Sequence, residues 1–152
     1  MKFAHFADCH IGGWKEDKLR ELNMLAFKET VKVCLERNVD FILLPGDLFN
    51  TALPQIDYLK DVTAELKSIK DRNIPVYMVA GSHDFSPSGK TMLDVLEKAG
   101  LIINVMKKRG NKLEFTIDKT GAKITGMYGK RGGLEIKEYQ ELDNTNLEQE
   151  EG

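Results

Sequence analysis

The chain has 152 residues, of which 41% are apolar and 30% are charged, and its formal net charge is −2. This balance is typical of a globular protein with a buried core, and it excludes a protein that coats nucleic acid through bulk positive charge. No apolar run approaches the roughly 20 residues that a membrane span needs. The first six residues lack the apolar core of a secretory signal. Two cysteines, Cys9 and Cys34, are too few for a disulfide framework. We therefore expect a cytoplasmic protein with no membrane contact.

Strands and helices are expected to alternate along the first two thirds of the chain. Short apolar runs predict strands over residues 2–7, 39–44, 74–80 and 101–105. Apolar residues at three- and four-residue steps predict helices over 16–37, from Pro54 to about residue 72, and over 91–99, with Gly100 as the last C-cap. This order predicts an α/β fold with a mainly parallel sheet and helices packed on it.

The last third of the chain has a different pattern. Residues 107–111 predict a polar turn, and strands are expected over 112–118 and 122–128 around a turn at 119–121. Residues 129–133 form a loop rich in glycine and cations. The segment 135–152 is a polar tail, for which helix and partial disorder both remain open.

Polar side chains follow three of the predicted strands at the point where each strand ends. Asp8-Cys9-His10 follows the first strand, Gly46-Asp47 the second, and Gly81-Ser82-His83-Asp84 the third. Because ligands of open α/β folds bind at the carboxyl ends of the strands, we expect these side chains to meet at one edge of the sheet. Each cluster alone is also common turn or capping chemistry, so the hypothesis depends on their combination.

Carboxylates and imidazoles together suit Mn, Fe or Zn better than Ca, which prefers oxygen ligands alone. Asp47 is expected to bridge two cations, and two metals roughly 3.5–4 Å apart can clamp a phosphate and activate a water. Gly46 and Gly81 permit sharp turns beside the ligands. For Cys9, a small buried residue at a strand end is favoured over a metal ligand.

The three clusters, with Phe41-Ile42-Leu43-Leu44-Pro45 before the second and Ile11-Gly12-Gly13 after the first, resemble the calcineurin-like metallophosphoesterases. Within that superfamily the chain is most similar to the SbcD-like double-strand-break repair nucleases of bacteria and archaea. The resemblance is clear over residues 1–105 and looser to the end. It implies a sheet sandwich flanked by helices, of which residues 1–152 are the N-terminal, incomplete part. The family completes its site with later histidines, whereas the three histidines here are His5, His10 and His83.

The resemblance also implies a role for each matching residue. Asp8 and His10 would hold one metal, and Asp47 would bridge both. His83 would lie beside the scissile phosphate, where it would protonate the leaving oxygen or stabilise charge. Asp84 would orient His83.

Two positions depart from the family pattern. Ser82 stands where the family has an asparagine that binds the second metal, and a hydroxyl is a poorer ligand. Asn50 stands where the nuclease branch often has a histidine, and we expect it to contact the substrate. Trp14 and Arg131 are further candidate substrate contacts, although packing for Trp14, and solvated turn charge for Arg131 and for residues 107–109, are competing interpretations.

Three functions follow from these observations. The first is a DNA nuclease, exo- and possibly also endonucleolytic, that uses two Mn²⁺ ions in double-strand-break repair near the nucleoid. The resemblance implies DNA ends and an SMC-type coiled-coil ATPase as partners, and a homodimer formed by helices near 54–72 and 90–99. Leu59, Val95 and Ala99 would face the second subunit, or else their own sheet.

The second function is a phosphoesterase acting on a small phosphodiester or a phosphoprotein. The third is a non-catalytic dimerisation fragment.

Overall fold

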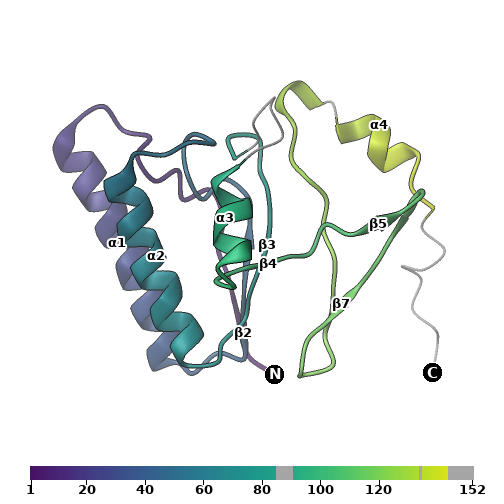
Figure 1. Cartoon of the computed structure of the whole chain (residues 1–152), viewed down its shortest axis with the longest axis horizontal. Coiled ribbons are helices and arrows are strands. Elements are labelled where there is room, and N and C mark those ends of the chain that lie inside the picture. Colours follow the sequence, from purple (N-terminus) through teal and green to yellow (C-terminus); the bar gives the residue numbers. More distant parts are fainter. Residues whose placement is uncertain (85–90, 134, 144–152) are drawn as a thin grey trace.

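The computed structural model describes residues 1–84, 91–133 and 135–143, and its centre is a four-stranded parallel sheet (Figure 1). The strands lie in the order β1-β2-β3-β4. Ala4 pairs with Ile42, Leu43 with Tyr77, and Met78 with Asn104. The bounds are Phe3–His5 for β1, Phe41–Pro45 for β2, Val76–Val79 for β3 and Ile103–Asn104 for β4. The predicted parallel sheet is therefore confirmed, with strands shorter than expected.

Three helices cover one face of this sheet. They are α1 (Asp17–Glu36), α2 (Ile56–Asp71) and α3 (Met92–Lys98). The helices bury apolar residues at helical spacing, including Phe27 and Val31 of α1 and Leu66 of α2, against Ile42 and Met78 of the sheet. Helix α3 ends before Gly100, whose φ is 68°, as the sequence predicted. It begins with a reciprocal capping box between Thr91 and Asp94 that the sequence analysis did not name.

Two small hairpins follow β4, and residues of the second one pack on the other face of the sheet (Figure 1). Alternate strand residues point there, so Phe41, Tyr77 and Val79 pack with Val105 and Ile124. The first hairpin pairs β5 (Lys108–Arg109) with β6 (Lys112–Leu113), and the second pairs β7 (Thr116–Ile117) with β8 (Lys123–Ile124).

The second hairpin matches the predicted turn at 119–121, but two other predictions need correction. Residues 107–111 form strand β5 and a tight turn at Gly110, whose φ is 61°, instead of a plain polar turn. The strand expected over 112–118 is divided into β6 and β7. A 3-10 turn (Arg131–Gly133) and helix α4 (Glu135–Gln140) follow, while residues 144–152 of the expected tail lie outside the described residues. In the described part of the chain, no helix has the length and apolar character needed to cross a membrane.

Candidate metal centre

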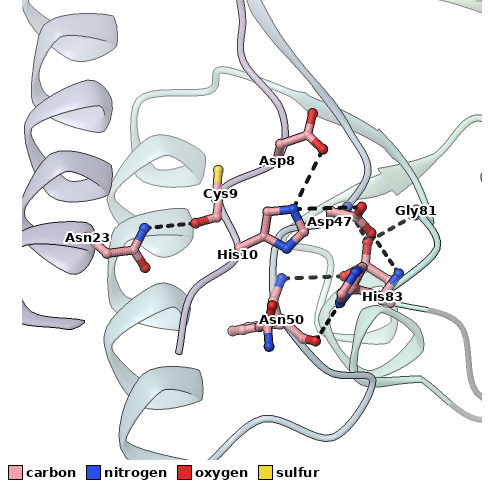
Figure 2. Close-up of polar contacts among 10 residues, drawn as sticks. Asp8, Cys9, His10, Asn23, Asp47, Asn50, Gly81 and His83 are labelled. Carbon is pink, nitrogen blue, oxygen red and sulfur yellow. Dashed lines mark hydrogen bonds and ion pairs between the residues drawn. The ribbon is translucent and has the colours of Figure 1, made fainter. Parts of the chain in front are cut away.

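The loops that leave β1, β2 and β3 bring the predicted side chains together (Figure 2). These three loops are called the first loop (6–16), the second loop (46–55) and the third loop (80–84). His10 Nε2 lies 3.7 Å from Asp8 Oδ1 and 4.0 Å from Asp47 Oδ2. His10, Asp47 and His83 each offer one ligand atom, and these atoms lie within 4.8 Å of one another. The convergence expected at the carboxyl ends of the strands is therefore present.

The backbone at three of these residues is in an unusual conformation. Asp8, His10 and Asp47 have φ values of 54°, 44° and 52°, in the left-handed region that non-glycine residues seldom adopt. Each costs about 1–2 kcal/mol relative to an ordinary conformation. Main-chain hydrogen bonds between the first and second loops offset this cost: His10 N donates to Asp47 O at 2.9 Å, and Ile11 N donates to Leu48 O at 3.0 Å. Strain concentrated on candidate ligands is typical of a functional site.

Glycine at position 81 allows the second and third loops to touch. A Cβ atom at this position would overlap the Asp47 carboxylate and would lie 2.6 Å from the Asp47 main-chain nitrogen. The close approach also lets His83 N donate to Asp47 Oδ1 at 2.8 Å. Gly46, with φ of 87°, makes the matching turn, and a Cβ there would lie 2.9 Å from Gly81 Cα.

The Asp84 carboxylate lies behind these loops, only 1% exposed. It accepts main-chain N–H groups from Asp47 at 2.6 Å, Gly81 at 3.0 Å and Phe49 at 3.4 Å. Burial raises the pKa of Asp84 above its ordinary value, although the three N–H donors oppose that shift. Asp84 therefore fixes the relative position of the second and third loops.

The sequence led us to expect that Asp84 orients His83, and a polar contact to the His83 ring comes from the main chain of Asn50. His83 Nδ1 lies 2.9 Å from the main-chain oxygen of Asn50. Because a carbonyl oxygen only accepts hydrogen bonds, we assign the proton to Nδ1, which leaves Nε2 available for a metal or a substrate. The His10 and His83 rings meet edge to face, with centroids 4.8 Å apart.

Cys9 is a half-buried free thiol. Burial, followed by the charges of Asp8 and Asp84, raises its pKa to about 12, so the thiol stays protonated. That Cys9 is a small residue at the strand end and not a metal ligand stays a prediction.

Asn23 is a residue of this site that sequence reasoning missed. Its Nδ2 donates to Cys9 O at 2.8 Å (Figure 2). The signal available in the sequence was an amide within the apolar stripe of α1, four residues before Phe27.

The remaining predicted residues differ in how exposed they are. Ser82 is half-buried beside His83, and Asp8 is the outermost member, with a side chain 73% exposed. Trp14 is 52% exposed, which fits a rim position better than a core position. Asn50 is half-buried, and the side chain of Arg131 lies outside the described part. Of the other cations, Arg109 pairs with Glu114 and Lys130 with Glu138, as surface turn charges commonly do.

The donor set fits a divalent transition metal. It combines the His10 imidazole with the Asp47 carboxylate, and the His83 imidazole and the exposed Asp8 carboxylate lie nearby, whereas calcium would prefer oxygen ligands alone. His10 directs Nε2 at the carboxylates, while its Nδ1 is buried and has no hydrogen-bond partner among residues 1–84, 91–133 and 135–143.

Comparison with known proteins agrees with this geometry. The model of the family described as calcineurin-like phosphoesterase matches residues 1–152. The DNA double-strand break repair protein Mre11 of Archaeoglobus fulgidus is 35% identical, over 73% of this chain and 25% of the relative. The protein of the same name from Methanococcus maripaludis is 29% identical, over 96% of this chain and 40% of the relative. The chain thus spans less than half the length of these relatives.

Among solved structures, the nuclease MPE of Pseudomonas putida is similar at 18% identity and a TM-score of 0.46, over 77% of this chain and 56% of that one. The match of the family model over the whole sequence decides the assignment. The chain belongs to the calcineurin-like phosphoesterase family.

Proposed function

We propose that the chain is the N-terminal part of a metal-dependent DNA nuclease that acts on DNA ends in double-strand-break repair. The observation that carries the proposal is the cluster of His10, Asp47 and His83, with ligand atoms within 4.8 Å of one another, on strained loops at the edge of a parallel sheet. The relatives named as double-strand break repair proteins support the substrate class. Mn²⁺ is the metal that we assign, with two ions in the complete domain.

The side chains of the cluster would have different roles in phosphodiester hydrolysis. Asp8, His10 and Asp47 would hold the metal, with Asp47 between the two ions. A divalent metal bound there supplies positive charge for the phosphate oxygens and lowers the pKa of an attacking water. As the new P–O bond forms, the bond to the leaving oxygen breaks. His83 Nε2, when protonated, gives its proton to that oxygen, while Nδ1 remains held by Asn50 O.

Contacts beyond the ligand cluster belong to the same proposal. Asn50, Trp14 and Arg131 would contact DNA. Trp14 and Asn50 lie in the first and second loops at this edge of the sheet, and Arg131 comes two residues after Gly129, whose N–H donates to Ala80 O of the third loop at 3.0 Å. Helices α2 and α3 would form a homodimer. Val95 and Ala99 are exposed as this requires, whereas Leu59 is half-buried and packs against the chain's own core. An SMC-type coiled-coil ATPase remains the proposed partner, with both proteins near the nucleoid.

The catalytic assignment is tested by replacing His83 with alanine in the full-length protein. His83→Ala should reduce Mn²⁺-dependent cleavage of linear duplex DNA at least about a hundredfold, the scale of losing a general acid. His5→Ala is the matched control, because His5 is an exposed histidine of β1 outside the ligand cluster. Wild-type turnover by His83→Ala would contradict the assignment.

A substrate panel separates this function from its alternatives. Linear duplex DNA should be cleaved in preference to a small chromogenic phosphodiester and to a phosphopeptide. Preference for either small substrate would favour the general phosphoesterase. Absence of bound Mn²⁺ in the purified protein would favour a non-catalytic dimerisation module.

A further inference from the structure

We propose that Asn23 of helix α1 is a positioning residue for the metal centre, acting through the peptide unit between Cys9 and His10. The inference rests on the proposed metal-dependent function and adds a residue to it. Asn23 does not touch the ligand atoms. Its amide instead holds the main chain between two candidate ligands, Asp8 and His10 (Figure 2).

The peptide unit between Cys9 and His10 is held at both of its polar groups. Its oxygen, Cys9 O, accepts from Asn23 Nδ2 at 2.8 Å, and its N–H, on His10, donates to Asp47 O at 2.9 Å. One side of this peptide is therefore tied to α1 and the other to the second loop. Rotation of the peptide plane would break one bond or both.

The orientation of this plane controls the direction of the flanking ligand. His10 lies at φ of 44°, and Asp8 on the other side of Cys9 lies at 54°. Neither conformation is favoured without outside support, since a histidine or an aspartate prefers negative φ. A peptide that relaxed toward ordinary angles would turn the His10 imidazole away from the carboxylates that its Nε2 now faces at 3.7 Å and 4.0 Å.

The half-buried position of Asn23 supports a specific role for its N–H. Asn23 occupies the core-facing stripe of α1, four residues before the buried Phe27. Its Oδ1 is buried and forms no hydrogen bond within the described residues. Leucine has the same branched arrangement of four side-chain heavy atoms and would avoid burying an unpaired oxygen, so what the amide adds at this position is the bond to Cys9.

Arg20, one turn earlier on α1, holds the far end of the same loop. Its Nη1 donates to Trp14 O at 3.1 Å and to Lys15 O at 2.8 Å. Helix α1 is thus hydrogen-bonded to the first loop at two places, but only the Asn23 contact lies next to a candidate metal ligand. The metal centre should accordingly be more sensitive to Asn23 than to Arg20.

The test is Mn²⁺ binding, measured by electron paramagnetic resonance of free and bound ion, on the wild type and three variants of the full-length protein. Asn23→Leu removes the donor while keeping the branched side-chain shape, and it should weaken Mn²⁺ binding by about 10–100-fold, as loss of a hydrogen bond that supports a ligand commonly does. Arg20→Leu should weaken it less. Val31→Ala shortens a fully buried residue of the same helix and serves as the stability control. Thermal unfolding of every variant is followed in parallel.

The proposal is supported if Asn23→Leu weakens binding far more than Val31→Ala does at a similar melting temperature. It is overturned if Asn23→Leu binds Mn²⁺ as tightly as the wild type, or if Val31→Ala weakens binding equally. If the wild-type protein binds no Mn²⁺, the result would contradict both the proposed function and this inference. A wild type that binds normally alongside an unaffected Asn23→Leu would remove only the inference.

Discussion

The main-chain N–H of Asp47 donates to the Asp84 carboxylate at 2.6 Å, so the central residue of the ligand cluster is held from behind by the third loop. The same carboxylate accepts the N–H of Gly81, which lies against the Asp47 side chain. Asp47 is thus fixed through its backbone by Asp84, while its Oδ1 accepts from His83 N and its Oδ2 faces His10. The direction of the proposed bridging carboxylate depends on these contacts.

Asp84→Asn should damage both stability and metal binding. An amide cannot accept several N–H groups as a buried carboxylate does, and its own N–H₂ would face other donors. We expect a loss of about 2–3 kcal/mol in the free energy of unfolding, the scale of hydrogen bonds to a charged group, and weaker Mn²⁺ binding. Urea unfolding and Mn²⁺ titration measure the two effects. Asp118→Asn alters another buried carboxylate, away from the site, and should lower stability without changing Mn²⁺ affinity. Unchanged Mn²⁺ affinity in Asp84→Asn would contradict this role.

Gly81→Ala should abolish the site by steric overlap. The added methyl group would collide with the Asp47 carboxylate and main-chain nitrogen, so the second and third loops must separate. Because small displacements of reacting groups cost about a hundredfold in rate, we expect at least that loss of DNA cleavage. Gly121→Ala is the control, since its φ of 89° is strained but no atom lies within 4 Å of the added methyl. It should lose about 1 kcal/mol of stability and keep full activity. Equal activity of the two variants would refute the steric explanation.

Ser82→Asn should strengthen binding of a second metal. The longer side chain brings an amide oxygen toward the cluster, where the family pattern places an asparagine ligand. Mn²⁺ stoichiometry by equilibrium dialysis should rise toward two ions per chain, with faster cleavage at low Mn²⁺. Ser82→Ala removes the hydroxyl without adding a ligand and should show no gain. If both variants bind the same amount of Mn²⁺, position 82 does not limit the second metal.

The buried pair of Tyr77 and Asp118 predicts how stability depends on pH. Tyr77 Oη donates to Asp118 Oδ1 at 2.6 Å, and Asp118 is 3% exposed. Burial alone would raise the pKa of Asp118, but hydrogen bonds from Tyr77 and Thr120 outweigh it and hold the pKa below its ordinary value. A depressed carboxyl pKa stabilises the fold above the unfolded pKa of about 3.9, and the contribution is lost as pH falls through the folded value.

Tyr77→Phe tests this linkage by removing one donor to Asp118. It should lower the free energy of unfolding by about 1 kcal/mol at pH 7, and the difference from wild type should shrink on acidification below about pH 4, where Asp118 becomes protonated. Chemical unfolding at pH 7 and pH 3 provides the measurement. A difference that grows toward acid would show that the sign of the Asp118 shift is wrong.

Residues that carry periodic or motif signals were predictable from the sequence. The stripe of α1, the capping box at Thr91 and the position of His10, Asp47 and His83 at strand ends all follow from local pattern. The contact of Asn50 O with His83 was not predictable, because every residue has a main-chain oxygen and only the fold brings this one to the ring. Likewise, the three N–H groups on Asp84 come from two separate loops, and the Asp47 donor lies 37 residues before Asp84 in the chain. Hairpin β5–β6 was missed because two-residue strands have no period to read.

The most direct test of the central claim is the location of Mn²⁺ in a crystal of the protein, determined from its anomalous scattering. The geometry predicts an ion bound by the Asp47 carboxylate and His10 Nε2, at the roughly 2.0–2.2 Å typical of oxygen and nitrogen ligands of such metals. A crystal soaked in Mn²⁺ whose anomalous peaks all lie away from His10, Asp47 and His83 would contradict the assignment of this cluster as a metal centre.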